Sequence, residues 1–401
     1  KVGKVSEFSK ILPNHIAGNS GIAHTRWATH GGVTDANAHP HLSENESIAV
    51  VHNGIINNSR DLRNRLEQRG FELKSETDSE ALVHMISIGI ESGQEPLEAV
   101  RQTLKRATGT WGLCVLFKDH DLIVCARNGS PLILGKGDGE SFIASDPHAL
   151  SQHTQNFYFL EDGDMAVVTR DGIDISRLEG GMSSTSMTVI EDEWGEADMA
   201  GFPTFMLKEI HEQPEALRRC ITGRLDMANG SAKLGGLRLE PLRLRTTPHV
   251  RLIGCGTALN ACKIGQLAIE SLARIPAVAH VASEFRYNDP VINPNAIHFA
   301  VSQSGETADT LSAVKEIQLK GGDVHGIVNV VGSTIARLCG QGVYIHSGPE
   351  QAVASTKAFT NMVASLLLFA IRIGRTRSFS REKGQSIIKD FEKIPEQMER
   401  Y

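Results

Sequence analysis

Short apolar runs separated by Gly, Asn and Asp turns dominate residues 1–175. Runs of this length are typical of strands. Two stretches instead repeat their apolar residues every three or four positions, Ser59–Arg69 and a segment that starts at Asp78 or Ser79, and this spacing predicts helices. Strands grouped with a few helices predict an α+β layered domain. The predicted strands are Ile48–Val51, Trp111–Phe117, Asp121–Ala126, Leu132–Leu134, Phe142–Ala144 and Asp164–Thr169.

The pattern changes at Pro248, where short apolar strands begin to alternate with longer helical stretches. Such alternation is typical of a parallel sheet that is covered by helices on both faces, which is a three-layer arrangement. The overall fold class is therefore predicted as α/β. The strands are expected at Val250–Ile253, Ala277–Ala282, Ile297–Val301, Val324–Val330 and Val343–Ile345, with helices at about 258–272, 306–320 and 355–373.

These patterns divide the chain into four segments. Residues 1–175 form the first predicted domain and residues 246–375 the second. Residues 176–245 are less regular, with a Gly-Gly pair, a Ser/Thr cluster and one helix at Phe205–Gln213, so we expect a linker with a connector helix. Residues 376–401 are predicted to connect to a further domain, with a charged amphipathic helix over 380–401.

Composition narrows the class of protein. The chain has 401 residues, more than one hydrophobic core usually holds, and 40% of them are apolar. Its formal net charge of -6 argues against a nucleic-acid-binding surface. The longest apolar stretch, Met362–Ile371, is too short to span a bilayer, so we predict a buried helix and no membrane partner.

The spacing of the cysteines and the lack of a signal pattern near the N-terminus favour a cytoplasmic protein. The six cysteines form no C-x-x-C pair, which favours reduced thiols in a cytoplasmic protein over disulfides or a zinc site. No secretory signal pattern is visible. The chain starts with Lys1 rather than Met, so we expect the gene product to begin further upstream. The cysteines are Cys114, Cys125, Cys220, Cys255, Cys262 and Cys339.

The clearest chemical signal is a polar turn between the predicted strand Ile297–Val301 and the helix after it. In an open parallel sheet, ligands bind at the carboxyl ends of strands, and a helix N-terminus there offers N–H groups to a phosphate. An ordinary N-cap explains one hydroxyl of the turn but not four polar donors. We therefore predict a phosphate site. The donors are Ser302, Gln303, Ser304 and Thr307.

Two further loops follow strands in the same sheet. Gly254-Cys255-Gly256-Thr257 suggests a dinucleotide site with Glu284 as the ribose partner, but Leu259 stands where the third glycine belongs, so this interpretation is weak. Ser355 or Thr356 precedes a long apolar helix, where a helix cap and a ligand contact are equally good explanations. If all three loops meet at one crevice, each gains support as part of a ligand site.

Polar residues also cluster in the first domain, at 24–31, 52–54 and 75–78. Five histidines (24, 30, 39, 41 and 52) invite a zinc interpretation, but no H-E-x-x-H or Cys/His spacing supports it, so we predict no metal. Asn53-Gly54 has two interpretations. It is a good hairpin turn, and its amide and N–H groups are also suited to stabilising an oxyanion.

Three stretches of the second domain carry a family resemblance: Ala282–Tyr287, Ser302–Thr310 and Val353–Thr360. They resemble the SIS (sugar isomerase) domain, in particular the first such domain of the glutamine–fructose-6-phosphate aminotransferase family. The resemblance implies that Ser302, Gln303, Ser304, Thr307 and Thr257 hold the phosphate of a sugar phosphate. It also implies that Val353 and Ser355 meet the sugar hydroxyls. The family often has Ser where this chain has Ala258.

The polar clusters of the first domain resemble a class II (N-terminal-nucleophile) glutamine amidotransferase domain. The resemblance implies that Asn53 and Gly54 form the oxyanion hole. Arg26 would pair with the glutamine carboxylate, as suits a guanidinium, and Asp78 would take the α-amino group. Thr29 and His30 would shape the pocket, and Trp27 would lie at the mouth of an ammonia path.

The nucleophile of that family is an N-terminal cysteine. Because this chain starts with Lys1, we expect the glutaminase domain to be incomplete, and we expect the isomerase acid/base residues in a second SIS domain beyond residue 401. Met206–Pro214 matches the family's connector.

The resemblance implies an enzyme that transfers the amide nitrogen of L-glutamine to fructose-6-phosphate, forms glucosamine-6-phosphate, needs no cofactor and acts as a homodimer. One alternative is a sugar-phosphate-sensing SIS module, which has no use for the glutamine residues. Another is a different class II amidotransferase such as amidophosphoribosyltransferase, whose acidic pyrophosphate-binding loop is absent here.

Overall fold

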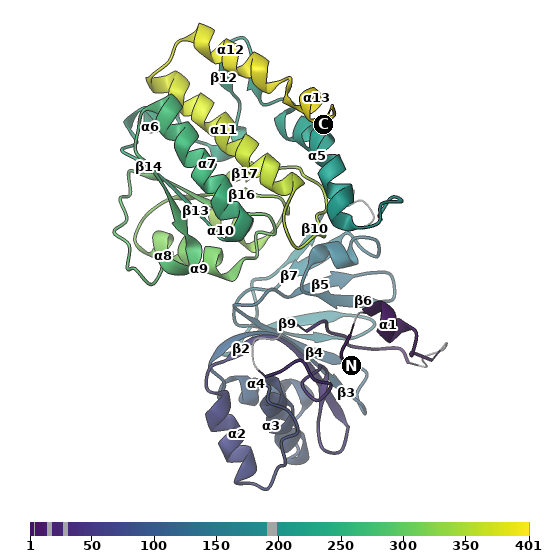
Figure 1. Cartoon of the computed structure of the whole chain (residues 1–401). Helices are drawn as coiled ribbons and strands as arrows, with labels where there is room; N and C mark the ends of the chain where they lie inside the picture. Colours follow the sequence, from purple (N-terminus) through teal and green to yellow (C-terminus); the bar gives the residue numbers. More distant parts are fainter. Residues whose placement is uncertain (4, 14–17, 27–30, 191–198, 401) are drawn as a thin grey trace. The chain divides into compact units, whose positions relative to one another are not determined.

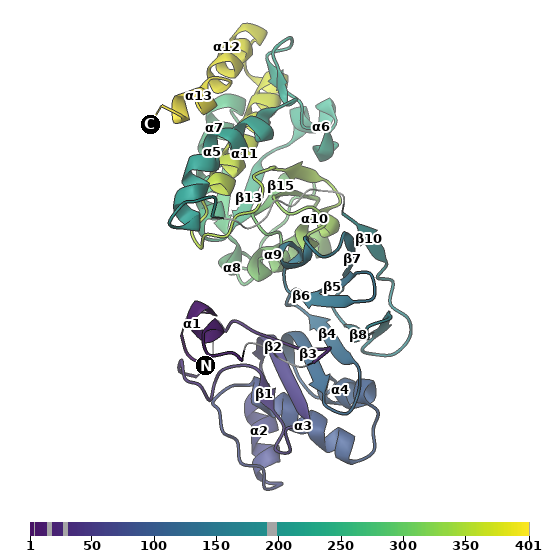
Figure 2. The ribbon, with the colours of Figure 1, turned by 90° about the vertical axis from the view of Figure 1, so that its right-hand side faces the viewer.

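The computed structural model describes residues 1–3, 5–13, 18–26, 31–190 and 199–400 (Figures 1 and 2). The chain divides into two compact units, Lys1–Asp192 and Glu193–Tyr401. The predicted segment bounds at 175, 245 and 375 stay predictions.

Unit 1 contains two antiparallel sheets and a layer of helices. The six-stranded sheet has the order β1-β2-β3-β4-β8-β9 and the four-stranded sheet the order β10-β7-β5-β6. Alternation along β3 explains the layers, because Leu113 and Val115 pack with the helices, whereas Cys114 packs with Leu134 of the second sheet.

The strands of the first sheet are β1 (His41–Leu42), β2 (Ile48–Ile56), β3 (Gly109–Phe117), β4 (Ile123–Asn128), β8 (Asp164–Val168) and β9 (Ile173–Arg177). Those of the second are β5 (Ile133–Lys136), β6 (Ser141–Ala144), β7 (Asn156–Phe159) and β10 (Met187–Val189). The helices are α1 (Val5–Ser9), α2 (Ser59–Glu67), α3 (Ser79–Glu91), α4 (Pro96–Leu104) and the short η1 (Pro147–Leu150). The predicted α+β layering is confirmed.

Unit 2 is built on a five-stranded sheet in which every neighbouring pair is parallel, with the order β14-β13-β15-β16-β17. Residues of β15 alternate between the two faces. Phe299 packs with α7, α11 and α5, whereas Ala300 packs with α8, α9 and α10. Figures 1 and 2 both show α7 beside α11. The predicted three-layer parallel sheet, and with it the α/β class, is confirmed.

The strands of this sheet are β13 (Val250–Gly254), β14 (Ala277–Val281), β15 (Ile297–Ser302), β16 (Val324–Val328) and β17 (Gly342–Tyr344). The helices are α5 (Phe205–Ile221), α6 (Pro241–Thr246), α7 (Gly256–Ala273), α8 (Ala282–Phe285), α9 (Ala308–Leu319), α10 (Thr334–Cys339), α11 (Lys357–Arg377), α12 (Arg381–Phe391) and α13 (Ile394–Met398). A small ribbon, β11 (Leu225–Asp226) and β12 (Ser231–Ala232), and the short η2 (Gly235–Leu237) complete the unit.

The C-terminal segment differs from the sequence prediction. One helix was expected over 380–401, but the structure has two, α12 and α13. Pro395 lies in the first turn of α13, and a proline ring cannot continue a preceding helix because it clashes with the carbonyl four residues earlier. The break therefore follows from Pro395.

The apolar segment Met362–Ile371 lies within α11, as a buried helix was predicted there. By length and composition alone, Lys357–Arg377 could cross a membrane, but 72% of its apolar window is buried inside the structure. Met362, Phe369 and Ile371 are each about 1% exposed. The helix is the centre of the core of unit 2.

Truncation of Phe369 tests this core. The ring is buried and meets Phe299 edge-on, with centroids 4.7 Å apart. We expect Phe369→Ala to lower the free energy of unfolding by about 3–5 kcal/mol, because it removes buried apolar surface and leaves a cavity. Leu319→Ala, at a side chain that is 84% exposed, should change it by less than about 0.5 kcal/mol. Chemical denaturation of the two variants measures both values, and equal losses would contradict the assignment.

Candidate functional site

The strand order of unit 2 opens a crevice at one end of its sheet. β13 and β15 are neighbours, but the helices that follow them, α7 and α9, cover opposite faces. At such a reversal the loops separate, and ligands of open α/β sheets bind there. The crevice contains a cavity of about 190 Å³. Its lining residues are Cys255, Thr257, Ala258, Val301, Ser302, Gln303, Ser304, Thr307, Glu350, Ala352, Val353, Ser355 and Met362.

All seven residues predicted to hold a sugar phosphate line this one cavity: Thr257, Ser302, Gln303, Ser304, Thr307, Val353 and Ser355. They come from three loops that lie far apart in the sequence, and the parallel sheet brings them together. Glu284, the ribose partner of the dinucleotide interpretation, is not among the lining residues and lies in α8.

The loop between β15 and α9 is held by its own hydroxyls. Ser302 Oγ lies 2.9 Å from Thr307 Oγ1 and accepts the Gly305 N–H at 3.0 Å. Thr307 occupies the N-cap position of α9, but its side chain makes no capping hydrogen bond. An ordinary N-cap therefore does not explain the Thr307 hydroxyl, and the first-turn N–H groups of α9 are left for a ligand.

Gly305 is required by the geometry of this loop. Its φ is +67°, in the left-handed region that favours glycine. A Cβ at this position would lie 2.0 Å from Ser333 Oγ and 2.5 Å from Ser333 Cβ, so turning the serine hydroxyl away would not relieve the clash. The tight turn between β15 and α9 is therefore possible only because Gly305 has no side chain.

The third loop is organised differently, because it caps its own helix. Ser355 Oγ accepts the Phe359 N–H at 3.1 Å, and Glu350 Oε1 accepts the N–H groups of Thr356 and Ala358 at 2.9 and 3.1 Å. The cap interpretation is therefore correct for Ser355. The Glu350 carboxylate opposes the partial positive charge of the α11 N-terminus, so α7 and α9 are the better anion sites.

Unit 1 contains a second polar cavity, of about 180 Å³. Asn53 and Gly54, which line it, lie inside β2 and pair with Gly112 and Trp111 of β3. The hairpin-turn interpretation of this dipeptide is therefore wrong. The cavity is lined by His24, Thr25, Arg26, His39, His52, Asn53, Gly54, Thr77, Asp78 and Ser79.

Gly54 has a φ of +140°, and a Cβ there would meet the Thr110 carbonyl oxygen at 2.2 Å. Only glycine lets the two strands approach this closely. Beside it, Asn53 Oδ1 lies 2.8 Å from His24 Nε2. This contact uses the amide oxygen of Asn53 and leaves its NH₂ group as the donor available to a ligand.

Arg26 and Asp78 also line the cavity, and both are tied to the backbone. Arg26 donates to the carbonyl oxygens of Gly32 at 2.9 Å and Gly31 at 3.4 Å. Asp78 is 7% exposed and accepts the Ile56 N–H at 2.7 Å. Four of the predicted glutamine-site residues thus meet in one place. The other three, Trp27, Thr29 and His30, lie outside the described residues.

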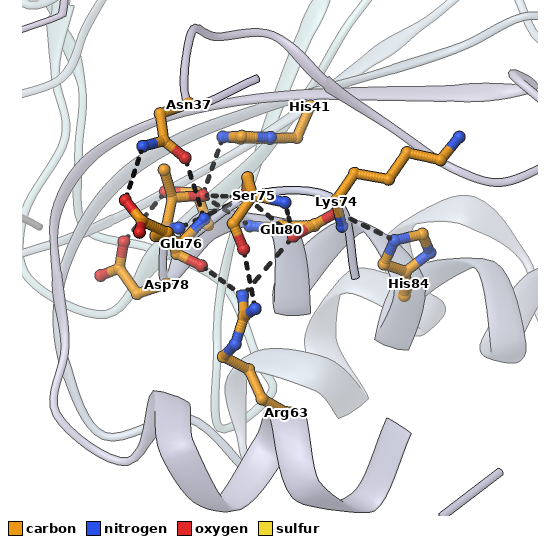
Figure 3. Close-up of polar contacts among 11 residues, drawn as sticks. Asn37, His41, Arg63, Lys74, Ser75, Glu76, Asp78, Glu80 and His84 are labelled. Carbon is orange, nitrogen blue, oxygen red and sulfur yellow. Dashed lines mark hydrogen bonds and ion pairs between the residues drawn. The ribbon is translucent and has the colours of Figure 1, made fainter. Parts of the chain in front are cut away.

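Sequence reasoning missed the network that holds the loop carrying Asp78 (Figure 3). Glu80, at the start of α3 and 4% exposed, accepts the N–H groups of Lys74 and Ser75 at 2.6 and 2.9 Å. Arg63 of α2 reaches the same loop and donates to the carbonyl oxygens of Ser75 and Thr77 at 2.7 and 2.9 Å. Burial by itself would raise the pKa of Glu80, but the hydrogen bonds from His84, Lys74 and Ser75 together outweigh it and lower the pKa to about 2. A Glu in the first helical turn was the only sequence signal.

Imidazoles line the second cavity, those of the partly buried His24 and His39 and of the buried His52, and His41 lies beside them. The rings of His24 and His39 stack with centroids 4.3 Å apart, and His39 Nδ1 accepts the His52 N–H at 3.2 Å. Burial, followed by the nearby His24, lowers the pKa of His39 to about 2, and burial lowers that of His41 to about 4. Burial also lowers the pKa of His24 and His52. These rings are therefore neutral near pH 7.

A metal site needs several of these nitrogens to point at one centre. Instead, His41 Nε2 lies 2.9 Å from Thr77 Oγ1 and His52 Nδ1 lies 2.8 Å from Ser79 Oγ. Within the described ranges, no group of three or more His, Cys, Asp or Glu side chains is arranged to hold a metal ion.

Comparison with known proteins identifies two domains. Residues 24–152 match the glutamine amidotransferase domain family, and residues 243–372 match the SIS domain family. The chain is similar to glutamine–fructose-6-phosphate aminotransferases (isomerizing). It is 43% identical to that of Thermus thermophilus over 99% of this chain, and 42% identical to that of Chlorobaculum tepidum, also over 99%. It spans 65% and 66% of the length of these two relatives, which is just under two thirds.

Two solved structures are also similar. The C-terminal domain of glucosamine-fructose-6-phosphate aminotransferase from Francisella tularensis is 32% identical, with a TM-score of 0.47, over 50% of this chain and 56% of that one. The glutamine phosphoribosylpyrophosphate amidotransferase of B. subtilis is 15% identical, with a TM-score of 0.35, over 84% and 80%.

The buried histidines make the stability of unit 1 depend on pH. The unfolded chain protonates its imidazoles near pH 6.5, whereas the folded protein keeps His39 neutral far below that. The unfolded state therefore binds more protons below pH 6.5, so the free energy of unfolding falls as the pH falls, and the full contribution is present above pH 6.5.

We expect His39→Asn to reduce this slope, between about pH 6.5 and pH 5, by up to about 1.4 kcal/mol per pH unit. Asparagine keeps an acceptor for the His52 N–H, so the change removes mainly the titrating group. Urea denaturation across this range measures the slope. The matched variant His120→Asn, at an exposed position, should keep the wild-type slope. Equal slopes for all three proteins would contradict the assignment.

Proposed function

The chain is related over 99% of its length to the glutamine–fructose-6-phosphate aminotransferases, and on that premise we propose that it takes part in converting fructose-6-phosphate to glucosamine-6-phosphate with L-glutamine as the nitrogen donor. Unit 1 provides the glutamine site and unit 2 the sugar-phosphate site. The observation that carries the proposal is that seven residues from three separate loops of the SIS domain line one polar cavity.

In the sugar site, the phosphate lies against the N-terminal turns of α7 and α9, with Thr257, Ser302, Gln303, Ser304 and Thr307 as its donors. Among the described residues that line the cavity there is no lysine or arginine, so N–H groups, hydroxyls and helix dipoles supply the attraction. Val353 and Ser355 meet the sugar. Ala258 lines the cavity without a hydroxyl, so the phosphate has one donor fewer than in relatives with Ser there.

In the glutamine site, Arg26 binds the carboxylate and Asp78 the α-amino group, while Trp27, Thr29 and His30 complete the pocket. The Gly54 N–H and the Asn53 amide stabilise the oxyanion that forms during hydrolysis of the glutamine amide. Because the histidines of this cavity are neutral near pH 7, they do not attract an anion. The attraction for the glutamine carboxylate therefore comes from the positive charge of Arg26.

A sugar-phosphate-sensing module would need the SIS cavity alone. The amidotransferase domain and its cavity, which Arg26, Asn53, Gly54 and Asp78 line together, favour the enzyme instead. A cytoplasmic location and assembly as a homodimer belong to the same proposal.

The sugar site is tested by removing its hydroxyls. Each hydrogen bond to a phosphate contributes roughly 1.5–3 kcal/mol, so Ser302→Ala and Thr307→Ala should each weaken fructose-6-phosphate binding by about ten- to a hundredfold. Calorimetric titration of the chain measures the affinity, and Ser378→Ala, at the far end of α11, serves as the control. Equal affinity for wild type and both site variants would refute the assignment.

The glutamine site is tested at Arg26. Lysine keeps the charge but cannot form two parallel hydrogen bonds to a carboxylate, so Arg26→Lys should weaken L-glutamine binding by about tenfold. Fructose-6-phosphate binding should stay unchanged in the same preparation, which shows that unit 2 is intact. A variant that binds L-glutamine as tightly as the wild type would rule out this role.

A further inference from the structure

One face of α5 holds the segment that walls the sugar cavity. Glu209, Glu212, Gln213 and Ala216 recur every three or four residues, so they lie on one side of the helix. Figures 1 and 2 both show this helix beside α11. The contacts from this face are Glu209 with the N–H groups of Gln351 and Ala352, Glu212 with Lys357, Gln213 with Thr360, and the Ala216 carbonyl oxygen with Asn361.

Pro214 inside this helix is accommodated by the same face. A proline has no N–H, so the carbonyl oxygen of Ile210 loses its normal helical donor. Gln213 replaces that donor, because its Nε2 lies 3.1 Å from the Ile210 oxygen. Its Oε1 accepts the Thr360 hydroxyl at 2.7 Å. One side chain therefore repairs α5 and fixes it against α11.

Glu209 is the most constrained member of this face. It is 2% exposed, and a buried carboxylate is stable only where donors replace its water. The donors recorded for it are backbone N–H groups of the cavity loop, with Ala352 N at 3.1 Å from Oε1 and 3.3 Å from Oε2, and Gln351 N against Oε1. Charge-assisted bonds of this kind are stronger than those between neutral groups.

The loop has little else to hold it at this point. Val353, directly after Ala352, is 94% exposed although it lines the cavity, so packing of its side chain does not fix its backbone. On one side of it, Ser347 and Gly348 are bound by Asn329. On the other side, the first N–H groups of α11 are bound by Glu350, which itself precedes this stretch. Within the part of the chain that the structure describes, the hydrogen bonds of residues 351–353 are those that Gln351 and Ala352 donate to Glu209.

We propose that Glu209, in the helix expected only to connect two domains, is a positioning residue of the sugar-phosphate site. It sets the backbone of residues 351–353 so that this loop can meet the sugar, and its importance for ligand binding rests on the proposed function of the cavity. It does not act on the phosphate. The loop that holds the phosphate, Ser302–Thr307, is fixed separately through its own hydroxyls and by contacts of Gln303 with Asn329 and of Gly305 with Ile335.

This separation of the two ends of the site gives a test that a general loss of folding would not imitate. Glu209→Gln keeps the shape of the side chain and removes the charge. Fructose-6-phosphate should bind about tenfold more weakly to this variant, whereas inorganic phosphate, used as a competing probe, should bind with unchanged affinity. The matched control is Glu270→Gln, because Glu270 of α7 also accepts a backbone N–H, from Ala277 at 3.2 Å, but at the opposite end of the sheet.

Amide hydrogen exchange of the wild-type chain provides a second measurement. The N–H groups of Gln351 and Ala352 should exchange slowly although their loop lies at the surface, and should exchange faster in Glu209→Gln. Unprotected amides at these two positions in the wild type would overturn the anchoring.

The outcomes separate the inference from the proposed function. If the wild type binds neither fructose-6-phosphate nor phosphate, the proposed function of the cavity fails, and the exchange data still decide whether Glu209 anchors the loop. If the wild type binds both ligands and Glu209→Gln binds fructose-6-phosphate equally well, the positioning role is wrong. An equal loss of both ligands would also overturn it, because it would indicate a general structural role.

Discussion

The parallel sheet of unit 2 must be covered by helices on both faces. Which helices cover which face determines where the sugar-phosphate cavity forms. Helices α7, α11 and α5 cover one face and α8, α9 and α10 the other. The strand order reverses between β13 and β15, so the helices after these strands leave in opposite directions. The polar loops Gly254–Thr257 and Ser302–Thr307 then open toward one crevice, where two helix N-termini face the same small volume.

The chemistry of that volume follows from what caps each helix. The side chains at the N-cap positions of α7 and α9 make no capping bond, whereas α11 is capped by Glu350 and Ser355. Two positive helix ends therefore remain available to an anion and a third is neutralised. The third loop consequently serves to shape the cavity, and α5 supports that loop through a buried carboxylate.

The polar cavity of unit 1 is lined in part by residues inside the antiparallel strand β2, and not by loops at the end of a parallel sheet. β2 continues past its apolar half into His52, Asn53 and Gly54, and pairing with β3 holds these residues in an extended backbone. The pairing is possible because Gly54 has no side chain to meet Thr110. Neutral histidines line the same cavity, and the network of Arg63 and Glu80 holds the loop that carries Asp78.

Local patterns were sufficient to predict the two layered domains and the polar loop Ser302–Thr307. Arg26, Asp78 and Val353 were assigned to their sites only through the family resemblance, and lining residues such as Glu350 and Ala352 were not predicted. The polar donors Ser302–Thr307 follow a buried strand and precede a helix, and that order alone places them at the end of a sheet. Periodicity could not say whether Asn53-Gly54 turns the chain or continues a strand, because the answer depends on Gly112 and Trp111 almost sixty residues away. Nor could it give a role to Glu209, which looks in sequence like an exposed charge of a connector helix. Its burial is decided by a loop more than a hundred residues later, and only the tertiary structure brings the two together.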